Sequence, residues 1–383
     1  MSNPIRSLHT DVNDRPFIVI WEVTRACALA CAHCRADAIA RRDPRELTTA
    51  QGFALLDDLA AYGPPRPMVV LTGGDPFERD DLAELIEYGT AAGLHVSLSP
   101  SVTPRLTADT LSAMHDAGAH VVSLSIDGAV AATHDAFRGI DGTFAATVAA
   151  AATVREAGLR LQLNTTVTAD NVYELPALLD LIVELDPVLW SVFFLVPTGR
   201  GSALRALPAP EIEQVLWWLH DIAHVVPVKT TEAPHFRRIA IQRAADHGGT
   251  GPGGDLFSDL LQRTRTYPPR RSTARGRSRP PLDVNAGRGF SFIDHTGSVQ
   301  PSGFLPVSVG SVRERSFSSI YREAPLLRAL RDPDALGGRC GRCEFRTVCG
   351  GSRSHAYAVT GDPLAEDPSC SYEPAGAPLY AAG

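Results

Sequence analysis

The sequence lacks any apolar run of the roughly 18–20 residues that a bilayer span requires. Its first six residues, from Met1 to Arg6, have no apolar segment behind their charge, so they do not form a secretory signal peptide. Hydrophobic residues make up 44% of the 383 residues and charged residues 21%, which excludes a mainly disordered, collagen-like or membrane-embedded chain. We therefore expect a cytoplasmic enzyme.

Acidic side chains outnumber basic ones, 43 to 36, for a formal net charge of −7. Seven of the basic residues lie in one stretch without acid: Arg263, Arg265, Arg270, Arg271, Arg275, Arg277 and Arg279. The rest of the chain is therefore more acidic still and would repel nucleic acid. Because Pro, Ser, Thr and Gly separate the arginines, we interpret the stretch as a solvated loop. Docking of an anionic substrate or partner is the alternative.

Cysteine is scarce and confined to two groups. Three cysteines lie near the N-terminus and four lie more than 300 residues later: Cys27, Cys31 and Cys34, then Cys340, Cys343, Cys349 and Cys370. An odd number in a chain without a secretory signal argues against a disulfide framework. Thiolates grouped in this way suit a soft metal or an iron–sulfur cluster.

Apolar runs alternate with amphipathic helical patterns over much of the chain. The runs predict strands at Phe17–Trp21, Met68–Leu71, Leu94–Ser99, His120–Ile126, Leu159–Val167 and Val188–Val196. The helical patterns cover residues 49–62, 80–92, 107–117, 143–157, 173–185 and 210–224. Short buried strands between helices predict parallel βαβ units. A complete eight-unit barrel needs about 250 residues, so we predict an α/β fold with a partial (β/α)6, TIM-like barrel, or an open doubly wound sheet.

The pattern also predicts domain boundaries. Residues 1–16 form an N-terminal segment and residues 17–226 the barrel. Residues 227–289 form a connecting segment with a loop rich in Gly, Pro and Arg. From residue 290 we predict a small C-terminal domain that begins with a hairpin over 290–301, continues with a helix near 317–331 and ends with the second cysteine group.

The first cysteine group follows the first predicted strand directly. Barrel and open-sheet enzymes place their active sites at this end of the strands, and three thiolates leave one iron of a [4Fe–4S] cluster without a protein ligand. A zinc site completed by His33 is the alternative. The spacing resembles the radical SAM signature C-x3-C-x-aromatic-C, with His33 in the aromatic position. The resemblance implies that the open iron binds S-adenosylmethionine (SAM), and that an electron cleaves SAM to methionine and a 5′-deoxyadenosyl radical.

The radical SAM resemblance also implies SAM contacts at the ends of later strands. Gly73-Gly74-Asp75 matches the family's Gly-Gly-Glu motif, with Asp in place of Glu, and would hold the ammonium group of SAM. Arg138 would hold the carboxylate. The remaining contacts implied for ribose, carboxylate and adenine are Ser125, Asn164 and the backbone of Leu195 and Val196, beside His33. The sequence identifies no acid–base residue, although Glu232, His235, His355 and Tyr357 lie in segments expected to face the space between domains.

The second cysteine group has the spacing C-x2-C-x5-C-x20-C. Taken alone, this pattern permits a zinc ribbon. In a radical SAM chain it resembles the SPASM or twitch extension, which implies an auxiliary [4Fe–4S] cluster held by Cys340, Cys343, Cys349 and Cys370. Full SPASM domains hold a further, inner cluster, whose cysteines would fall near Val284, at Ser302, and at Ser352 or Arg353. None of these residues is cysteine, so the comparison implies two clusters.

Several longer motifs resemble the maturases of heme d1 and of the alternative heme pathway, over about residues 15–372. They are Arg15-Pro16-Phe17, Trp21–Cys27, Thr72–Pro76, Thr230–Pro234, and the segment from Cys349-Gly350-Gly351 through Gly361-Asp362-Pro363. The resemblance implies hydrogen abstraction from a tetrapyrrole side chain, with a flavodoxin- or ferredoxin-type electron donor. A peptide maturase and a radical dehydrogenase of a carbohydrate or other small molecule are the enzymatic alternatives. A zinc-binding structural protein is the alternative from a different class, and no nucleic-acid or membrane partner is expected.

Overall fold

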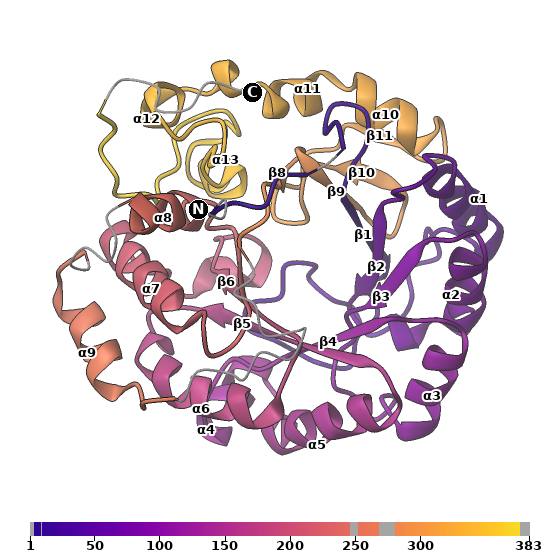
Figure 1. Cartoon of the computed structure of the whole chain (residues 1–383). Coiled ribbons are helices and arrows are strands. Elements are labelled where there is room, and N and C mark those ends of the chain that lie inside the picture. The colour runs from indigo at the N-terminus through magenta and orange to yellow at the C-terminus, as the bar shows by residue number, and fades with distance from the viewer. Residues whose placement is uncertain (1–3, 9, 246–251, 268–279, 376–383) are drawn as a thin grey trace.

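One curled sheet organises the chain in the computed structural model, which describes residues 4–8, 10–245, 252–267 and 280–375. Seven strands follow each other in chain order and pair in parallel: β1 (Ile18–Thr24), β2 (Met68–Gly73), β3 (His95–Leu98), β4 (Val121–Ser125), β5 (Arg160–Val167), β6 (Leu189–Phe194) and β7 (Val228–Thr231). Figure 1 looks into this partial barrel. The predicted α/β class and partial TIM-like barrel are confirmed.

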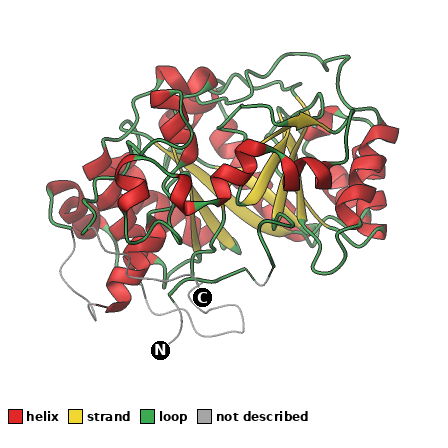
Figure 2. Ribbon diagram, turned by 90° about the horizontal axis from the view of Figure 1, so that it is seen from above, coloured by secondary structure: helices red, strands yellow, loops and turns green. Residues whose placement is uncertain are grey.

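Helices cover the outer face of the sheet, as Figures 1 and 2 show. In chain order the helices are α1 (Thr49–Ala60), α2 (Leu82–Ala91), α3 (Ala108–Asp116), α4 (Ala131–Arg138), α5 (Thr143–Glu156), α6 (Leu175–Leu185), α7 (Ala209–Ile222), α8 (Phe236–Ala245) and α9 (Asp255–Arg263). Among them, α4 packs on α5, and α9 packs on α6 and α7. Trp190 on β6 and Trp218 on α7 are fully buried and meet edge to face, with ring centroids 6.3 Å apart. Leu, Ile and Val side chains make up most of the buried core around this pair, and the edge-to-face contact adds to their apolar burial.

The C-terminal strands continue the barrel sheet at its first edge. Strand β9 (Gly289–Ile293) pairs in parallel with β1, and β10 (Ser298–Gln300) pairs antiparallel with β9. The short strands β8 (Asn285–Ala286) and β11 (Gly310–Ser311) pair with β9 and β10. Strand β1 therefore lies between the barrel and the C-terminal region, and so does the cysteine loop that follows it.

The remaining C-terminal elements are helical: α10 (Phe317–Glu323), α11 (Pro325–Arg331), α12 (Gly338–Arg342) and α13 (Arg353–Thr360). The helix predicted near 317–331 is broken in two, because Pro325 has no N–H to continue the first helix. Short 3₁₀ turns occur at Pro76–Glu78, Val172–Glu174, Gly199–Ala203 and Pro333–Ala335. Among the described residues, no helix is both long and apolar enough to span a bilayer.

The arginine-rich stretch is described only at its start. Arg263 pairs with Asp259 at 2.9 Å and Arg265 with Asp180 at 3.0 Å. Both arginine side chains are more than half exposed, which agrees with a solvated stretch. The other five arginines, Arg270, Arg271, Arg275, Arg277 and Arg279, lie outside the described residues.

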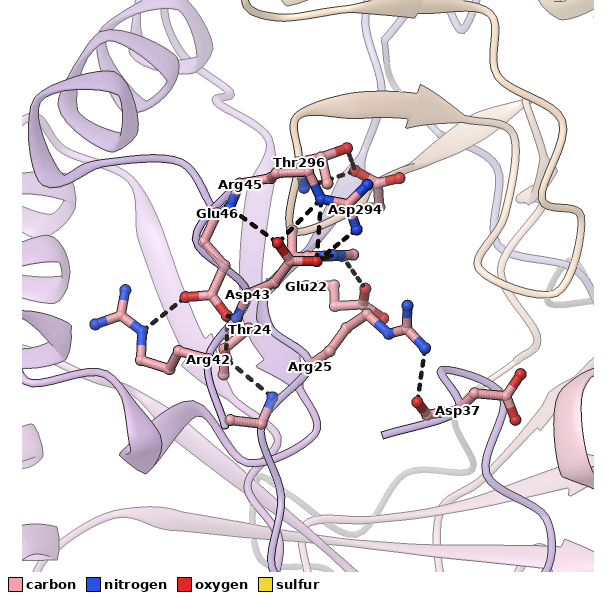
Figure 3. Close-up of polar contacts among 12 residues, drawn as sticks. Glu22, Thr24, Arg25, Asp37, Arg42, Asp43, Arg45, Glu46, Asp294 and Thr296 are labelled. Carbon is pink, nitrogen blue, oxygen red and sulfur yellow. Dashed lines mark hydrogen bonds and ion pairs between the residues drawn. The ribbon is translucent and has the colours of Figure 1, made fainter. Parts of the chain in front are cut away.

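A buried polar network ties the β9–β10 turn to the cysteine loop. The ring nitrogens of His295 lie 3.1 Å from Glu22 Oε1 on β1 and 3.3 Å from Asp43 Oδ2 in the loop. Arg35, next to the last cysteine of the loop, donates to Glu22 Oε2 at 2.7 Å. Figure 3 shows the carboxylates of Glu22 and Asp43, and the bond from Thr24 to the nearby Glu46. The network holds the loop against two neighbouring strands.

The charge of His295 makes this network sensitive to pH. Burial lowers the pKa of His295, but bonds to Glu22 and Asp43 outweigh burial and raise the pKa above its ordinary value. The pKa of both carboxyl groups is lowered, so they stay charged. Stability from protonated His295 is therefore fully present below about pH 6.5 and is lost as pH rises through the raised pKa.

We expect His295→Gln to destabilise the chain by about 1.5–3 kcal/mol near pH 5.5, the range for hydrogen bonds to charged groups. The difference from wild type should shrink toward about pH 9, because wild-type His295 is then neutral. Urea denaturation at several pH values measures it. His115→Gln is the matched control, since His115 is half exposed beside Asp116. A cost of His295→Gln that does not change with pH would contradict this charge assignment.

Candidate active site

The first three cysteines share one short loop at the carboxyl end of β1. Cys31 is buried, and Cys27 and Cys34 are half buried. The N–H of Cys34 donates to the carbonyl of Cys31 at 3.2 Å, and the N–H of Leu29 donates to Cys27 Sγ at 3.3 Å. Burial raises the pKa of the Cys27 thiol. A cation is therefore needed to keep this sulfur as a thiolate, as a bound iron would do.

Gly73 and Gly74 support the backbone of this loop. A Cβ on Gly73 would lie 2.0 Å from the carbonyl oxygen of Thr24, and one on Gly74 would lie 2.3 Å from that of Ala26. The N–H of Gly74 also donates to Thr24 O at 2.9 Å. Side chains are therefore excluded here by contact with the loop itself, independently of any ligand.

Asp75 is fully buried at the end of β2. Its Oδ2 accepts from the hydroxyl of Thr103 at 2.7 Å, and its Oδ1 accepts from the N–H of Phe77 at 3.2 Å. Burial raises the pKa of this carboxyl group despite those donors. The backbone of Ser101 is a third donor to this carboxyl group, so only part of its acceptor capacity remains for a further donor.

Arg138 and His33 lie beside the cysteine loop. Arg138 forms a buried ion pair with Asp127, and its Nη1 lies 3.7 Å from Cys31 Sγ. His33 packs on Phe137 with ring centroids 4.6 Å apart. Burial lowers the pKa of His33 to about 4, so the ring is neutral. Arg138, which was expected to hold the carboxylate of SAM, is therefore paired with the carboxylate of Asp127 in the structure.

The other predicted SAM contacts lie at the end of β4, within β5 and directly after β6. Ser125 and Asn164 are register partners on adjacent strands, and Asn164 Oδ1 accepts from Gln162 at 2.8 Å. Leu195 and Val196 follow β6 directly. The carbonyl of Leu195 lies 2.9 Å from His355 Nε2 on α13, so it already has a hydrogen-bond partner. This contact joins the C-terminal region to the mouth of the barrel.

The second cysteine group lines one open cavity. All four cysteines line it, together with Arg238, Arg339, Arg346, Asp367 and Tyr372. Burial raises the pKa of Cys343 to about 11 and the pKa of Cys349 and Cys370 to about 12. The free thiols would therefore be protonated at neutral pH, and only a bound metal centre would make all four thiolates.

Four sulfur donors around one cavity, with arginines beside them, fit an anionic iron–sulfur cluster. Among the described residues, no three His, Cys, Asp or Glu side chains are arranged as ligands of one metal ion. The cysteines of a [4Fe–4S] cluster each bind a different iron atom, so this finding is compatible with such a cluster.

The positions expected for inner-cluster cysteines form other contacts. The hydroxyls of Ser302 and Ser352 both donate to the carboxylate of Glu232, at 3.2 and 2.6 Å. The carbonyl of Val284 accepts from Arg237 at 2.7 Å, and Arg353 reaches Cys340. Glu232 has a positive φ of 60°, which places its backbone in the left-handed region. Hydrogen bonds to Glu232 thus connect Ser302 and Ser352, two positions that the inner cluster of a full SPASM domain would connect through cysteines.

The other residues expected near this space are His235 and Tyr357. His235 is fully buried 3.9 Å from Asp367, and burial lowers its pKa to about 4. Tyr357 packs beside an apolar cluster formed by Ala286, Leu305 and Leu330. Among the described residues, neither ring nitrogen of His235 has a hydrogen-bond partner. Neither side chain is placed as an evident acid or base.

Comparison with known proteins identifies the family of this chain. Residues 21–182 match the model of the radical SAM superfamily. Over 93% of its length, the chain is 39% identical to an AdoMet-dependent heme synthase of Nitratidesulfovibrio vulgaris strain Hildenborough, of which it covers 92%. The chain therefore belongs to the radical SAM superfamily and is an enzyme; members of this superfamily bind SAM and an iron–sulfur cluster.

The chain is also similar to a second enzyme and to a solved structure. The chain is 31% identical to a pre-heme d1 synthase of Dinoroseobacter shibae, over 92% of this chain and 85% of the relative. The fold matches Streptococcus suis SuiB, solved with S-adenosylmethionine, with a TM-score of 0.66 at 14% identity, over 94% of this chain and 78% of SuiB. The predicted family, close to heme-pathway maturases, is confirmed.

Proposed function

We propose that this enzyme uses a SAM-derived radical to modify a side chain of an iron tetrapyrrole. The single observation that carries the proposal is the placement of three cysteines on one loop at the barrel mouth, in a chain 39% identical to a heme synthase over nearly its whole length. The names of two relatives support a tetrapyrrole substrate.

The cysteine loop is the proposed site of the catalytic cluster. Cys27, Cys31 and Cys34 would bind three irons and leave the fourth for the amino and carboxylate groups of SAM. When bound, this cluster supplies the electron that cleaves SAM to methionine and a 5′-deoxyadenosyl radical. Arg138 and Asp127 lie beside the loop and set its local charge.

The ends of the following strands form the proposed SAM site. Asp75 and the carbonyl groups near it would accept from the ammonium group, since a buried carboxylate makes a strong charge-assisted bond. Ser125 and Asn164 would bind the ribose or carboxylate, and the backbone of Leu195 and Val196 would meet the adenine. His33 on Phe137 would close this site on the loop side.

The second cysteine group is the proposed ligand set of one auxiliary [4Fe–4S] cluster. With four thiolates in use, this cluster offers no open iron to the substrate, so we assign it to electron transfer or structural support. The substrate would bind between the barrel mouth and the C-terminal region. A flavodoxin- or ferredoxin-type protein would supply electrons.

A peptide substrate is the second candidate, because solved relatives of this fold include SuiB bound to a precursor peptide. That likeness is at 14% identity and concerns the fold, whereas the heme synthase shares 39% of aligned residues. The identity therefore favours the tetrapyrrole.

Anaerobic reconstitution tests the proposal. We expect about eight irons and eight sulfides per chain, four for each cluster. With dithionite, the protein should convert SAM to 5′-deoxyadenosine, and an iron coproporphyrin with deuterated side chains should transfer deuterium into that product. Heme itself, already modified, is the control substrate. Twelve irons would contradict the two-cluster assignment, and SAM cleavage without deuterium transfer from any iron tetrapyrrole would contradict the substrate class.

A further inference from the structure

Arg353 is among the largest fully buried side chains of the described chain, with 1% of its surface exposed. Its Nε donates to Gly351 O at 3.2 Å, and its Nη1 donates to the carbonyls of Pro363 and Ala365 at 3.0 and 2.7 Å. Its Nη2 donates to Cys340 Sγ at 3.4 Å. The three carbonyl groups therefore fix the guanidinium so that Nη2 faces Cys340, the first cysteine of the second group.

The backbone around this contact leaves room for it. Gly351 has a φ of +64°, and a Cβ there would lie 2.5 Å from Arg353 Nη2 and 2.8 Å from Cys340 Sγ. The backbone N–H of Asp367 donates to the same sulfur at 3.3 Å. Cys340 thus accepts from two N–H groups, and any side chain at position 351 would separate the guanidinium from the sulfur.

The charge of Arg353 is distinct among the arginines near the cavity. Arg238, Arg339 and Arg346 line the cavity, and each forms an ion pair with an Asp or Glu side chain. Among the described residues, the contacts of Arg353 are the three carbonyls and the Cys340 sulfur, with no carboxylate. A buried charge without a counter-charge is costly. Asp367 is the nearest buried carboxylate, but its oxygens accept from Ser352 and Ser369, so a Cys340 thiolate would be the negative group that Arg353 contacts directly.

We propose that Arg353 is a positioning residue that raises the reduction potential of the cluster held by the second cysteine group. The inference rests on the proposed auxiliary cluster. Reduction adds one electron, and so one negative charge, to the cluster without breaking a bond. A buried cation and an N–H donor to the ligand sulfur stabilise the added charge. Position 353 is one of those where a cysteine of the inner cluster was expected. Its arginine side chain instead contacts Cys340 of the second cysteine group.

The test isolates the second cluster in a chain carrying Cys27→Ala, Cys31→Ala and Cys34→Ala. Its potential is measured by titration with dithionite, followed by electron paramagnetic resonance. Adding Arg353→Gln should lower the midpoint potential by at least 59 mV, a tenfold drop in the ratio of reduced to oxidised cluster at fixed potential. Arg353→Lys keeps the charge and should recover part of this shift. Arg346→Gln, which removes a cavity charge paired with Asp334, should change the potential much less.

Iron content separates the outcomes. If the background chain itself holds no iron, the proposed auxiliary cluster fails, and the role of Arg353 fails with it. A different outcome is that every variant holds about four irons but Arg353→Gln and Arg346→Gln have the same midpoint potential. In that case only the role of Arg353 is overturned.

If Arg353→Gln alone loses its iron, the background chain with ¹⁵N-labelled arginine decides. Pulsed resonance should then detect a guanidinium nitrogen coupled to the reduced cluster, and Arg353→Lys, which leaves the other cavity arginines in place, should lose that coupling. Absence of that coupling overturns the proposal.

Discussion

Replacing Cys27, Cys31 and Cys34 together with Ala should abolish the formation of 5′-deoxyadenosine from SAM, to the level of a protein-free control. These three residues are the only cysteines between β1 and α1. Without them, the loop has no thiolates to bind a cluster with an open iron. The measurement is chromatographic detection of 5′-deoxyadenosine after anaerobic reduction with dithionite.

The same variant should still bind iron at the second site. Its iron content should fall from about eight to about four atoms per chain, because Cys340, Cys343, Cys349 and Cys370 line a separate cavity. Replacing those four by Ala instead is the matched variant, and it should also retain about four irons, now with an open site. Undiminished SAM cleavage in the first variant would overturn the assignment of the catalytic cluster.

The sequence predicted the strands that carry the site because their signals are local. Each βαβ unit has an apolar run and an amphipathic helix close together in the chain, and all six predicted strands are found. The cysteine loop was equally accessible, since its spacing lies within eight residues, from Cys27 to Cys34. Helix α4 was not predicted, because Ala131–Arg138 is short and follows the fourth strand closely.

Long-range pairing could not be predicted in this way. Strand β7 pairs with β6 from within the predicted connecting segment, and β9 pairs with β1 although the two strands are far apart in the chain. Period and propensity describe a strand but do not name its partner. The sequence therefore could not show that the first strands of the C-terminal region pair with the barrel sheet.

Buried polar contacts between distant segments could not be predicted from the sequence either. The sequence singled out Arg353 only as a position where an inner-cluster cysteine could fall, yet its side chain is buried against Cys340. The bond of Thr103 to Asp75 joins two strand ends, and that of His355 to Leu195 joins α13 to the barrel. Each depends on segments that meet only in the fold, so no spacing rule would have paired them.

The Gly-Gly motif also has a contact within the protein that the sequence did not predict. The structure packs Gly74 against the loop that carries the cysteines, and the role of the motif toward SAM stays a prediction. We therefore expect Gly74→Ala to displace that loop. Its Cβ would lie 2.3 Å from Ala26 O and 2.6 Å from Arg25 O, and these are backbone atoms that cannot rotate away.

Overpacking of this kind costs about 1–3 kcal/mol, or about 5–150-fold in the population of the native loop. Gly74→Ala should lower SAM cleavage by about that factor and reduce iron at the first site, while the second site keeps about four irons. Gly337→Ala is the matched control, since its backbone is extended and its Cβ would meet no atom closer than 3.4 Å. It should keep about eight irons. If Gly74→Ala cleaves SAM at the wild-type rate with a full iron content, the loop does not depend on this contact, and the motif would then serve SAM alone.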